Sequence, residues 1–165
     1  MNNLLNLPLV SATRRNHALE HAAVHLLSAR YPQRGMGGHS NPTGFFIFGD
    51  LPTEDVRSAV HEALARLQGG EAGLAIHPGC GTNYAVMGLL AGAFALLGMS
   101  GTKSDRQRLE RFPLVMALSV LAFMIAPPLG TALQKQVTTD PNPGNLTVLE
   151  VSRVSKTVHR VRTHL

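Results

Sequence analysis

The chain has 165 residues and a net charge of +5, with 44% apolar and only 15% charged residues. An average soluble domain is about 25% charged, so the charge content is low, and the length allows one modest core. A single cysteine excludes an intrachain disulfide framework, and the composition excludes disordered and collagen-like classes. Charged residues are distributed unevenly along the chain, and this distribution helps to locate the predicted elements.

The first predicted helix covers residues 16–30, because the run NHALEHAAVHLLSAR is rich in alanine and leucine and ends before Tyr31–Pro32. Residues 33–40 are glycine-rich and are expected to form a flexible loop. The apolar run 45–48, closed by Gly49, predicts a short strand.

A second, amphipathic helix is predicted to begin with Thr53 as its cap and to end at Gly69–Gly70. Glu54 and Asp55 suit its first turn, where negative charge is favourable. The run Leu74–His77 then predicts a short strand.

Two nearly charge-free runs follow, and they predict a transmembrane hairpin with spans at 83–101 and 112–133. The second run is about 33 Å long as a helix, enough to cross a bilayer, whereas the first reaches that length only with interfacial residues at both ends. The alternative is that both are buried helices of a compact bundle. Gly88 and Gly92 form a Gly-x-x-x-Gly face, which lets two helices approach closely in lipid.

The orientation of the hairpin is left open by two opposing arguments. Four basic residues lie between the spans, and the positive-inside rule places such a loop in the cytoplasm. The start of the chain has no signal-peptide pattern that would export a leading domain.

Apolar and polar residues alternate in the tail over Leu146–Val154 and Val158–Thr163, which predicts a β-hairpin with its turn at Ser155–Lys156. Strands from both sides of the spans are able to share one sheet. The basic tail suits contact with anionic lipid, and no nucleic-acid partner is expected because the tail lacks aromatic stacking residues.

The predicted fold class is therefore α+β. The expected organisation is an extramembrane helix-strand-helix-strand domain at 1–82, a transmembrane hairpin at 83–134, and a tail at 135–165 whose β-hairpin joins that domain.

The first helix carries His17, His21 and His25 at i, i+4 and i+8, so that the three side chains share one face. Neutral imidazoles one turn apart are placed to chelate a divalent metal such as zinc. His77 and Cys80 in the sequence HPGC are candidates to complete the ligand shell, as is His39.

Glu20 and the flanking histidines give the five-residue sequence His17-Ala18-Leu19-Glu20-His21, which resembles the His-x-x-Glu-His motif of inverted zincins. The resemblance implies zinc bound by His17 and His21, with Glu20 as general base. The chain departs from that family because no downstream glutamate lies in a recognisable ligand context.

Two other interpretations of the histidine face stay open. It is a solvated or hydrogen-bonded face opposite the apolar side of the helix, or it ligates haem. The remaining histidines, His61, His159 and His164, are predicted to lie at the surface.

The sequences RRNHALEHAAVH, GMGGHSNPTGFFIFGD and HPGCGTN, followed by a two-span hairpin, resemble an uncharacterised family of small bacterial membrane proteins. The resemblance implies a location in the bacterial inner membrane, with the lipid bilayer as partner, and it implies no activity. The leading hypothesis is a zinc-binding membrane protein, which would be a metal-dependent hydrolase if the metal keeps one position open for water. The alternative is a non-enzymatic assembly or scaffold subunit that forms homo- or hetero-oligomers through Gly88 and Gly92.

Overall fold

The computed structural model describes residues 4–165, which divide into two compact units. The first unit combines the residues up to His77 with Gln134–Leu165, and the second is the segment Pro78–Leu133 between them. The chain therefore leaves the first unit, forms the second and returns.

Two long helices and three short helical turns belong to the first unit. Helix α1 spans Pro8–Arg30 and follows the 3₁₀ turn η1 at Leu4–Asn6. It begins earlier than predicted because Pro8 occupies the first helical turn, where its missing N–H costs no hydrogen bond. Helix α2 spans Thr53–Gln68, as its periodicity predicted. The short turns are η2 at Ala72–Ala75 and η3 at Gln134–Thr138.

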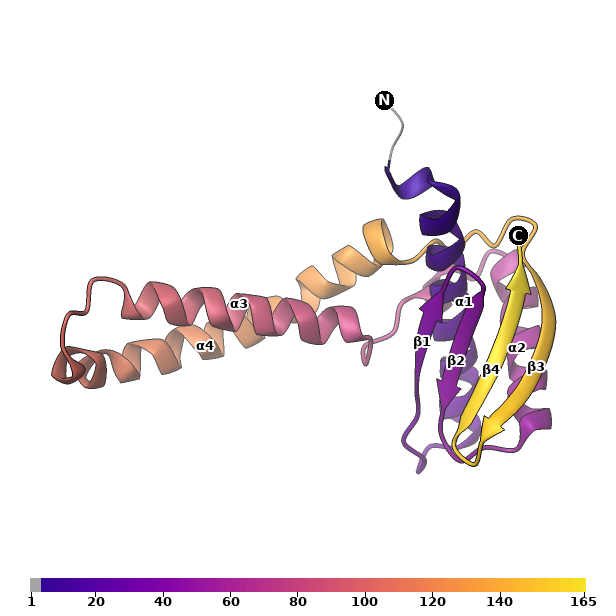
Figure 1. Cartoon of the computed structure of the whole chain (residues 1–165), viewed down its shortest axis with the longest axis horizontal. Coiled ribbons are helices and arrows are strands. Elements are labelled where there is room, and N and C mark those ends of the chain that lie inside the picture. The colour runs from indigo at the N-terminus through magenta and orange to yellow at the C-terminus, as the bar shows by residue number, and fades with distance from the viewer. Residues whose placement is uncertain (1–3) are drawn as a thin grey trace. The chain divides into compact units, whose positions relative to one another are not determined.

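The first unit contains one four-stranded antiparallel sheet in the order β1-β2-β4-β3. The strands are β1 at Gly37–Asn41, β2 at Gly44–Phe48, β3 at Thr147–Ser155 and β4 at Val158–His164. The α+β class and the C-terminal β-hairpin are confirmed. Strands β2 and β4 pair directly, so the sheet joins segments that precede and follow the second unit (Figure 1).

Helices α1 and α2 cover one face of the sheet and form the core with it (Figure 1). Burial of these apolar side chains is the main favourable term in the folding of this unit. The largest fully buried apolar side chains are Leu19, Leu27, Phe45, Ile47, Leu51, Val56, Val60, Leu146 and Val161.

Two short segments differ from their sequence-based predictions. The predicted strand at Leu74–His77 is not formed, because Leu74 and Ala75 belong to the 3₁₀ turn η2. The carbonyl groups of Ala75 and Ile76 accept hydrogen bonds from His21 and His25 of α1 instead of from a neighbouring strand. The glycine-rich run forms the edge strand β1, where Gly38 leaves the space that the Glu20 side chain fills. A Cβ atom at Gly38 would lie 2.3 Å from Glu20 Oε1.

The prediction that His159 lies at the surface is wrong. Its side chain is fully buried, on the face of β4 that points into the core. Its Nε2 atom lies 3.1 Å from Thr53 Oγ1. The Thr53 hydroxyl therefore pairs across the core instead of capping α2, and the N-cap position is occupied by Pro52.

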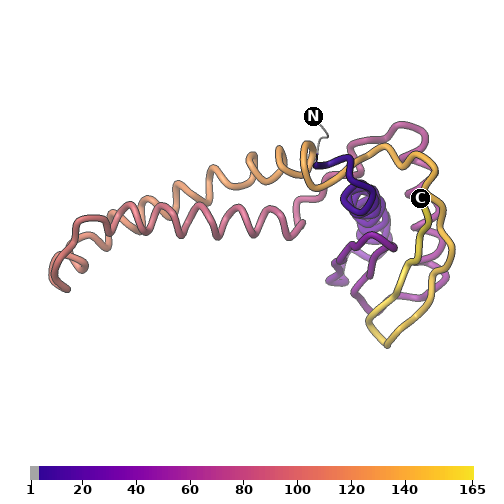
Figure 2. The backbone as a smooth tube through the Cα atoms, turned by 45° about the horizontal axis from the view of Figure 1, so that its top comes forward, coloured from indigo at the N-terminus to yellow at the C-terminus, as the bar shows by residue number. Residues whose placement is uncertain are grey.

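The second unit is a hairpin of α3, at Gly81–Met99, and α4, at Asp105–Leu133, which lie side by side (Figures 1 and 2). Both helices are long and apolar enough to span a membrane. Helix α4 contains Pro127 and Pro128 and continues to Leu133. Large apolar side chains point outward along both helices, among them Leu89, Leu96 and Met124.

The hairpin packs at glycines other than the predicted pair. A Cβ atom at Gly98 would lie 2.8 Å from Val115 Cγ2, and one at Gly130 would lie 2.2 Å from Asn83 Oδ1. Gly88 and Gly92, in contrast, have open space at the Cβ position. The Gly-x-x-x-Gly face is therefore not what joins α3 to α4.

This difference predicts the outcome of two matched glycine substitutions. Gly130→Ala is expected to destabilise the hairpin by about 1–3 kcal/mol, because the added methyl group overlaps the Asn83 side chain and approaches its Cα atom at 3.0 Å. Gly88→Ala meets open space and should leave stability within about 0.5 kcal/mol. Unfolding of the detergent-solubilised protein, followed by circular dichroism, measures both. Equal stability of the two variants would contradict this packing.

Candidate metal centre

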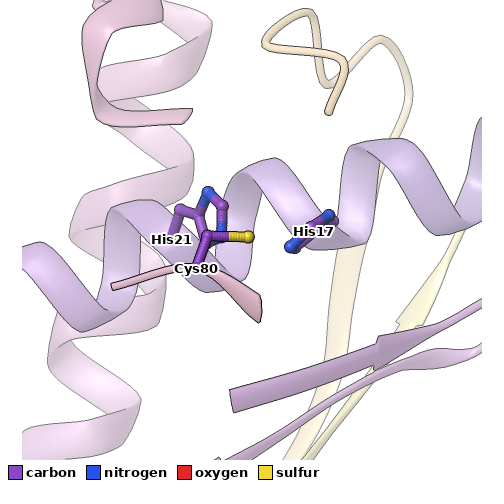
Figure 3. Close-up of side chains that lie close together, drawn as sticks. All are labelled: His17, His21 and Cys80. Atoms are coloured by element: carbon purple, nitrogen blue, oxygen red, sulfur yellow. The ribbon is translucent and has the colours of Figure 1, made fainter. Parts of the chain in front are cut away.

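Four histidine rings of the first unit form a continuous row. The ring centroids of His17 and His21 are 4.3 Å apart, those of His21 and His77 are 5.7 Å apart, and those of His25 and His77 are 4.7 Å apart. His17, His21 and His25 come from successive turns of α1, as their spacing predicted, and His77 follows η2. Figure 3 shows His17 and His21 on adjacent turns of α1.

Hydrogen bonds to backbone carbonyl groups fix the tautomers of His17 and His21. His17 Nδ1 lies 2.9 Å from the Thr138 carbonyl oxygen, and His21 Nδ1 lies 2.7 Å from that of Ala75. Because a carbonyl oxygen only accepts, each Nδ1 must carry the proton, and in a neutral ring the lone pair is then on Nε2. Metal-binding histidines characteristically donate the other ring N–H in this way, which fixes the ring and raises its basicity.

His25 is held in the opposite sense. Its Nε2 atom donates to the Ile76 carbonyl oxygen over 2.7 Å, which leaves the lone pair of the neutral ring on Nδ1, close to the helix backbone. The three histidines of α1 are therefore not equivalent. His17 and His21 both donate from Nδ1. His25 donates from Nε2 and holds α1 against the residue that follows η2.

The backbone of His77 is clamped by a buried amide. The His77 N–H donates to Gln134 Oε1 over 2.9 Å, and Gln134 Nε2 donates to the His77 carbonyl oxygen over 3.1 Å. Burial, together with the nearby His25 and His21 rings, lowers the pKa of the His77 ring to about 4. His77 is therefore neutral at pH 7, the state in which an imidazole binds metals.

Glu20 belongs to a different surface of α1. Its carboxylate is buried, accepts a hydrogen bond from Ser40 Oγ over 2.6 Å and packs on Gly38 of β1. Burial raises the pKa of Glu20 above its usual value, although the Ser40 hydrogen bond and the charges of His17 and His39 oppose the rise. In this arrangement Glu20 ties α1 to the edge of the sheet.

The other candidate donors lie apart from the histidine row or in the second unit. His39 is exposed on β1. Cys80 belongs to the second unit and precedes α3 as its N-cap, where its Sγ accepts a hydrogen bond from the Thr82 N–H at 3.4 Å. His61 and His164 are exposed, as predicted.

Sequence reasoning missed the groups that position the histidines. The acceptors are main-chain carbonyl groups of Thr138, Ala75 and Ile76, which have no side-chain signature. Gln134, the buried clamp, lies directly after a long apolar run, and a polar residue at such a position is readily interpreted as interfacial.

Comparison with known proteins places the chain in a family. Residues 12–151 match the family described as Domain of unknown function (DUF6391). The chain belongs to this family. It is also 36% identical, over 147 residues, to an uncharacterized protein of Picosynechococcus sp. (strain PCC 7002), a match that covers 84% of this chain and 70% of the relative. No solved structure matches the chain.

The segment of this DUF6391 protein that matches the family contains both helices of the hairpin and the whole histidine row. The expectation of an uncharacterised bacterial family is thereby confirmed. The histidine row thus lies in the part of the chain that matches the family, not in an appended segment.

The lowered pKa of His77 predicts loss of stability in acid. The unfolded chain binds this proton near pH 6.5 and the folded protein near pH 4, so stability is complete above about pH 6.5 and falls as the pH drops toward 4. Buried His159, whose pKa is also lowered, contributes in the same direction. Melting temperatures of the metal-free protein between pH 7 and 4 should decline less in His77→Gln than in wild type. Exposed His61→Gln is the control, and a decline identical in all three proteins would contradict the assignment.

Proposed function

We propose that this DUF6391 protein is an integral membrane protein of the bacterial cell membrane that binds a divalent metal ion, zinc in the first place, through Nε2 of His17 and His21. The observation that carries the proposal is the pair of carbonyl-bonded Nδ1 atoms. In the neutral form of these two rings, which lie one helical turn apart, the lone pair is on Nε2. A merely solvated histidine face would sample both tautomers instead of one.

Cys80 is the proposed third ligand. Cys80 follows His77 by three positions, so the covalent chain limits the distance between their Cα atoms to about 11 Å. The His77 ring lies beside His21, and the tether therefore keeps the thiol within the neighbourhood of the proposed site. Two imidazoles and a thiolate are a donor set that zinc binds well. His77 is the proposed fourth donor, since its ring is neutral and its backbone is clamped.

The large exposed apolar surface of α3 and α4 supports membrane insertion. Only 11% of the most apolar window in each helix is buried, and neither helix lies at the start of the chain. A core helix of a soluble protein would be mostly buried, and a secretion signal would be N-terminal. Exposed apolar surface of this extent needs an apolar partner, and the lipid of a bilayer would cover two adjacent spans of this length.

Hydrolysis would add one requirement to metal binding, a base able to reach a metal-bound water. Glu20 is the candidate of the His-x-x-Glu-His motif, and its carboxylate is engaged with Ser40 and packed on Gly38. Since these contacts explain a buried glutamate without catalysis, the proposal is limited to metal binding.

Elemental analysis tests the proposed site. Full-length protein purified without a histidine tag is expected to hold about one zinc ion per chain. His17→Ala/His21→Ala should lose it, and Cys80→Ser should bind it more weakly, roughly 10- to 100-fold. His61→Ala, an exposed histidine on α2, is the matched control and should keep the metal. Equal metal content in the double variant and the control would refute the assignment.

A second candidate function, a scaffold subunit of a membrane complex, is favoured by one observation. Gly88 and Gly92 are exposed on α3 with open space at their Cβ positions, while the hairpin uses Gly98 and Gly130 for its own packing. A small-residue face of this kind suits a helix from another subunit.

Crosslinking in mild detergent tests the scaffold function. Wild-type protein is expected to give dimers or larger complexes, and Gly92→Leu should reduce them because the leucine blocks close approach. Ala93→Leu, at a neighbouring exposed position, is the control and should leave the crosslinks unchanged. A wild-type monomer that is insensitive to Gly92→Leu would remove this candidate.

A further inference from the structure

A hollow of about 340 Å³ lies in the first unit, between η2 and the chain that follows α4. Ala72, Gly73 and Ala75 form one side, and Lys135, Thr139 and Pro141 form the other. This volume is at the lower end of the range of small-ligand pockets, about 300–1,000 Å³. It is large enough for part of a lipid-sized molecule.

The chemistry of the lining selects an apolar ligand with one negative charge. Most of the lining side chains are alanine, isoleucine and proline, and the Thr139 hydroxyl already donates to the Gln134 carbonyl oxygen over 2.8 Å. Lys135 is the one charged lining residue, and its exposed side chain makes no ion pair within residues 4–165. The hollow thus offers an apolar surface beside a single unpaired ammonium group.

The position of Lys135 in the chain indicates where such a ligand comes from. Lys135 follows Leu133, the last residue of the apolar helix α4, by two positions. A lysine directly after a membrane span lies at the level of the lipid head groups, where it meets phosphate. A phospholipid combines an apolar chain with a phosphate at this depth.

We infer that the hollow holds an acyl chain of an anionic phospholipid whose phosphate pairs with Lys135. This inference rests on the proposed membrane insertion and is independent of the metal site. It assigns the first unit a lipid-binding site of its own, in addition to the bilayer contact of the two spans.

Gly73 allows the hollow to be filled without disturbing the backbone. A Cβ atom at Gly73 meets nothing within 4 Å, and the residue does not have the positive φ that disfavours side chains. Gly73→Leu should therefore place its side chain in the hollow. Gly35 has the same open surroundings and lies outside the hollow, so Gly35→Leu is the matched control.

Photolabelling of the full-length protein tests the inference. The protein is reconstituted into phosphatidylcholine nanodiscs that contain a trace of phosphatidylglycerol with a photoreactive group in one acyl chain. After irradiation, labelled peptides are mapped by mass spectrometry. Labelling is expected at residues 72–76 and 135–141 in wild type and in Gly35→Leu, and it should be lost at these residues in Gly73→Leu.

Lys135→Gln examines the charge of the ligand. Replacing the lysine should lower labelling by the phosphatidylglycerol probe about fivefold, to the level of a phosphatidylcholine probe with the same chain. Equal labelling by the two probes in wild type, or labelling unaffected by Gly73→Leu, would overturn the inference. Failure of the chain to enter nanodiscs at all would instead refute membrane insertion, so the two failures are distinguishable.

Discussion

The histidine face of α1 packs against η2 and η3, and this packing sets where the chain leaves and re-enters the first unit. Imidazole N–H groups and carbonyl groups that are removed from water are costly without partners. Here the ring N–H groups of buried His21 and of half-buried His17 and His25 each donate to a carbonyl oxygen. Because η2 ends just before the second unit and η3 begins just after it, these bonds hold the two places where the chain leaves and re-enters the first unit on one helix of that unit. The Gln134 amide adds a direct link between the departing and the returning chain.

The same hydrogen bonds that complete the fold also determine the chemistry of the rings. A histidine face that was merely solvated would sample both tautomers, whereas the carbonyl acceptors select one tautomer at each position. His17 and His21 become equivalent and His25 becomes their opposite, although all three repeat at the same spacing. The fold therefore divides a three-residue sequence repeat into two rings protonated on Nδ1, His17 and His21, and one protonated on Nε2, His25.

The sequence predicted those parts of the fold that depend on local pattern. The periodicity of α2 and the alternation in the tail gave correct elements, and the two charge-free runs are the two helices of the hairpin. The sequence-based predictions were wrong where contacts between distant residues determine the local structure. Leu74–His77 has strand-like composition, but its carbonyl groups pair with histidine rings, and the Gly38 position depends on a glutamate 18 residues earlier. The burial of His159 depends equally on a partner, Thr53, that is far away in the sequence.

For the candidate site, spacing identified the histidines of α1, and topology brought His77 beside them. The sequence could not predict which ring nitrogen of each histidine carries the proton, because main-chain carbonyl groups determine it. Nitrogen-15 NMR of the imidazole rings distinguishes the two tautomers. In metal-free protein, His17 and His21 should carry the proton on Nδ1 and His25 on Nε2, and added zinc should shift Nε2 of His17 and His21 alone. Protonated Nε2 atoms in the pair, or a zinc shift at His25 instead, would contradict the account.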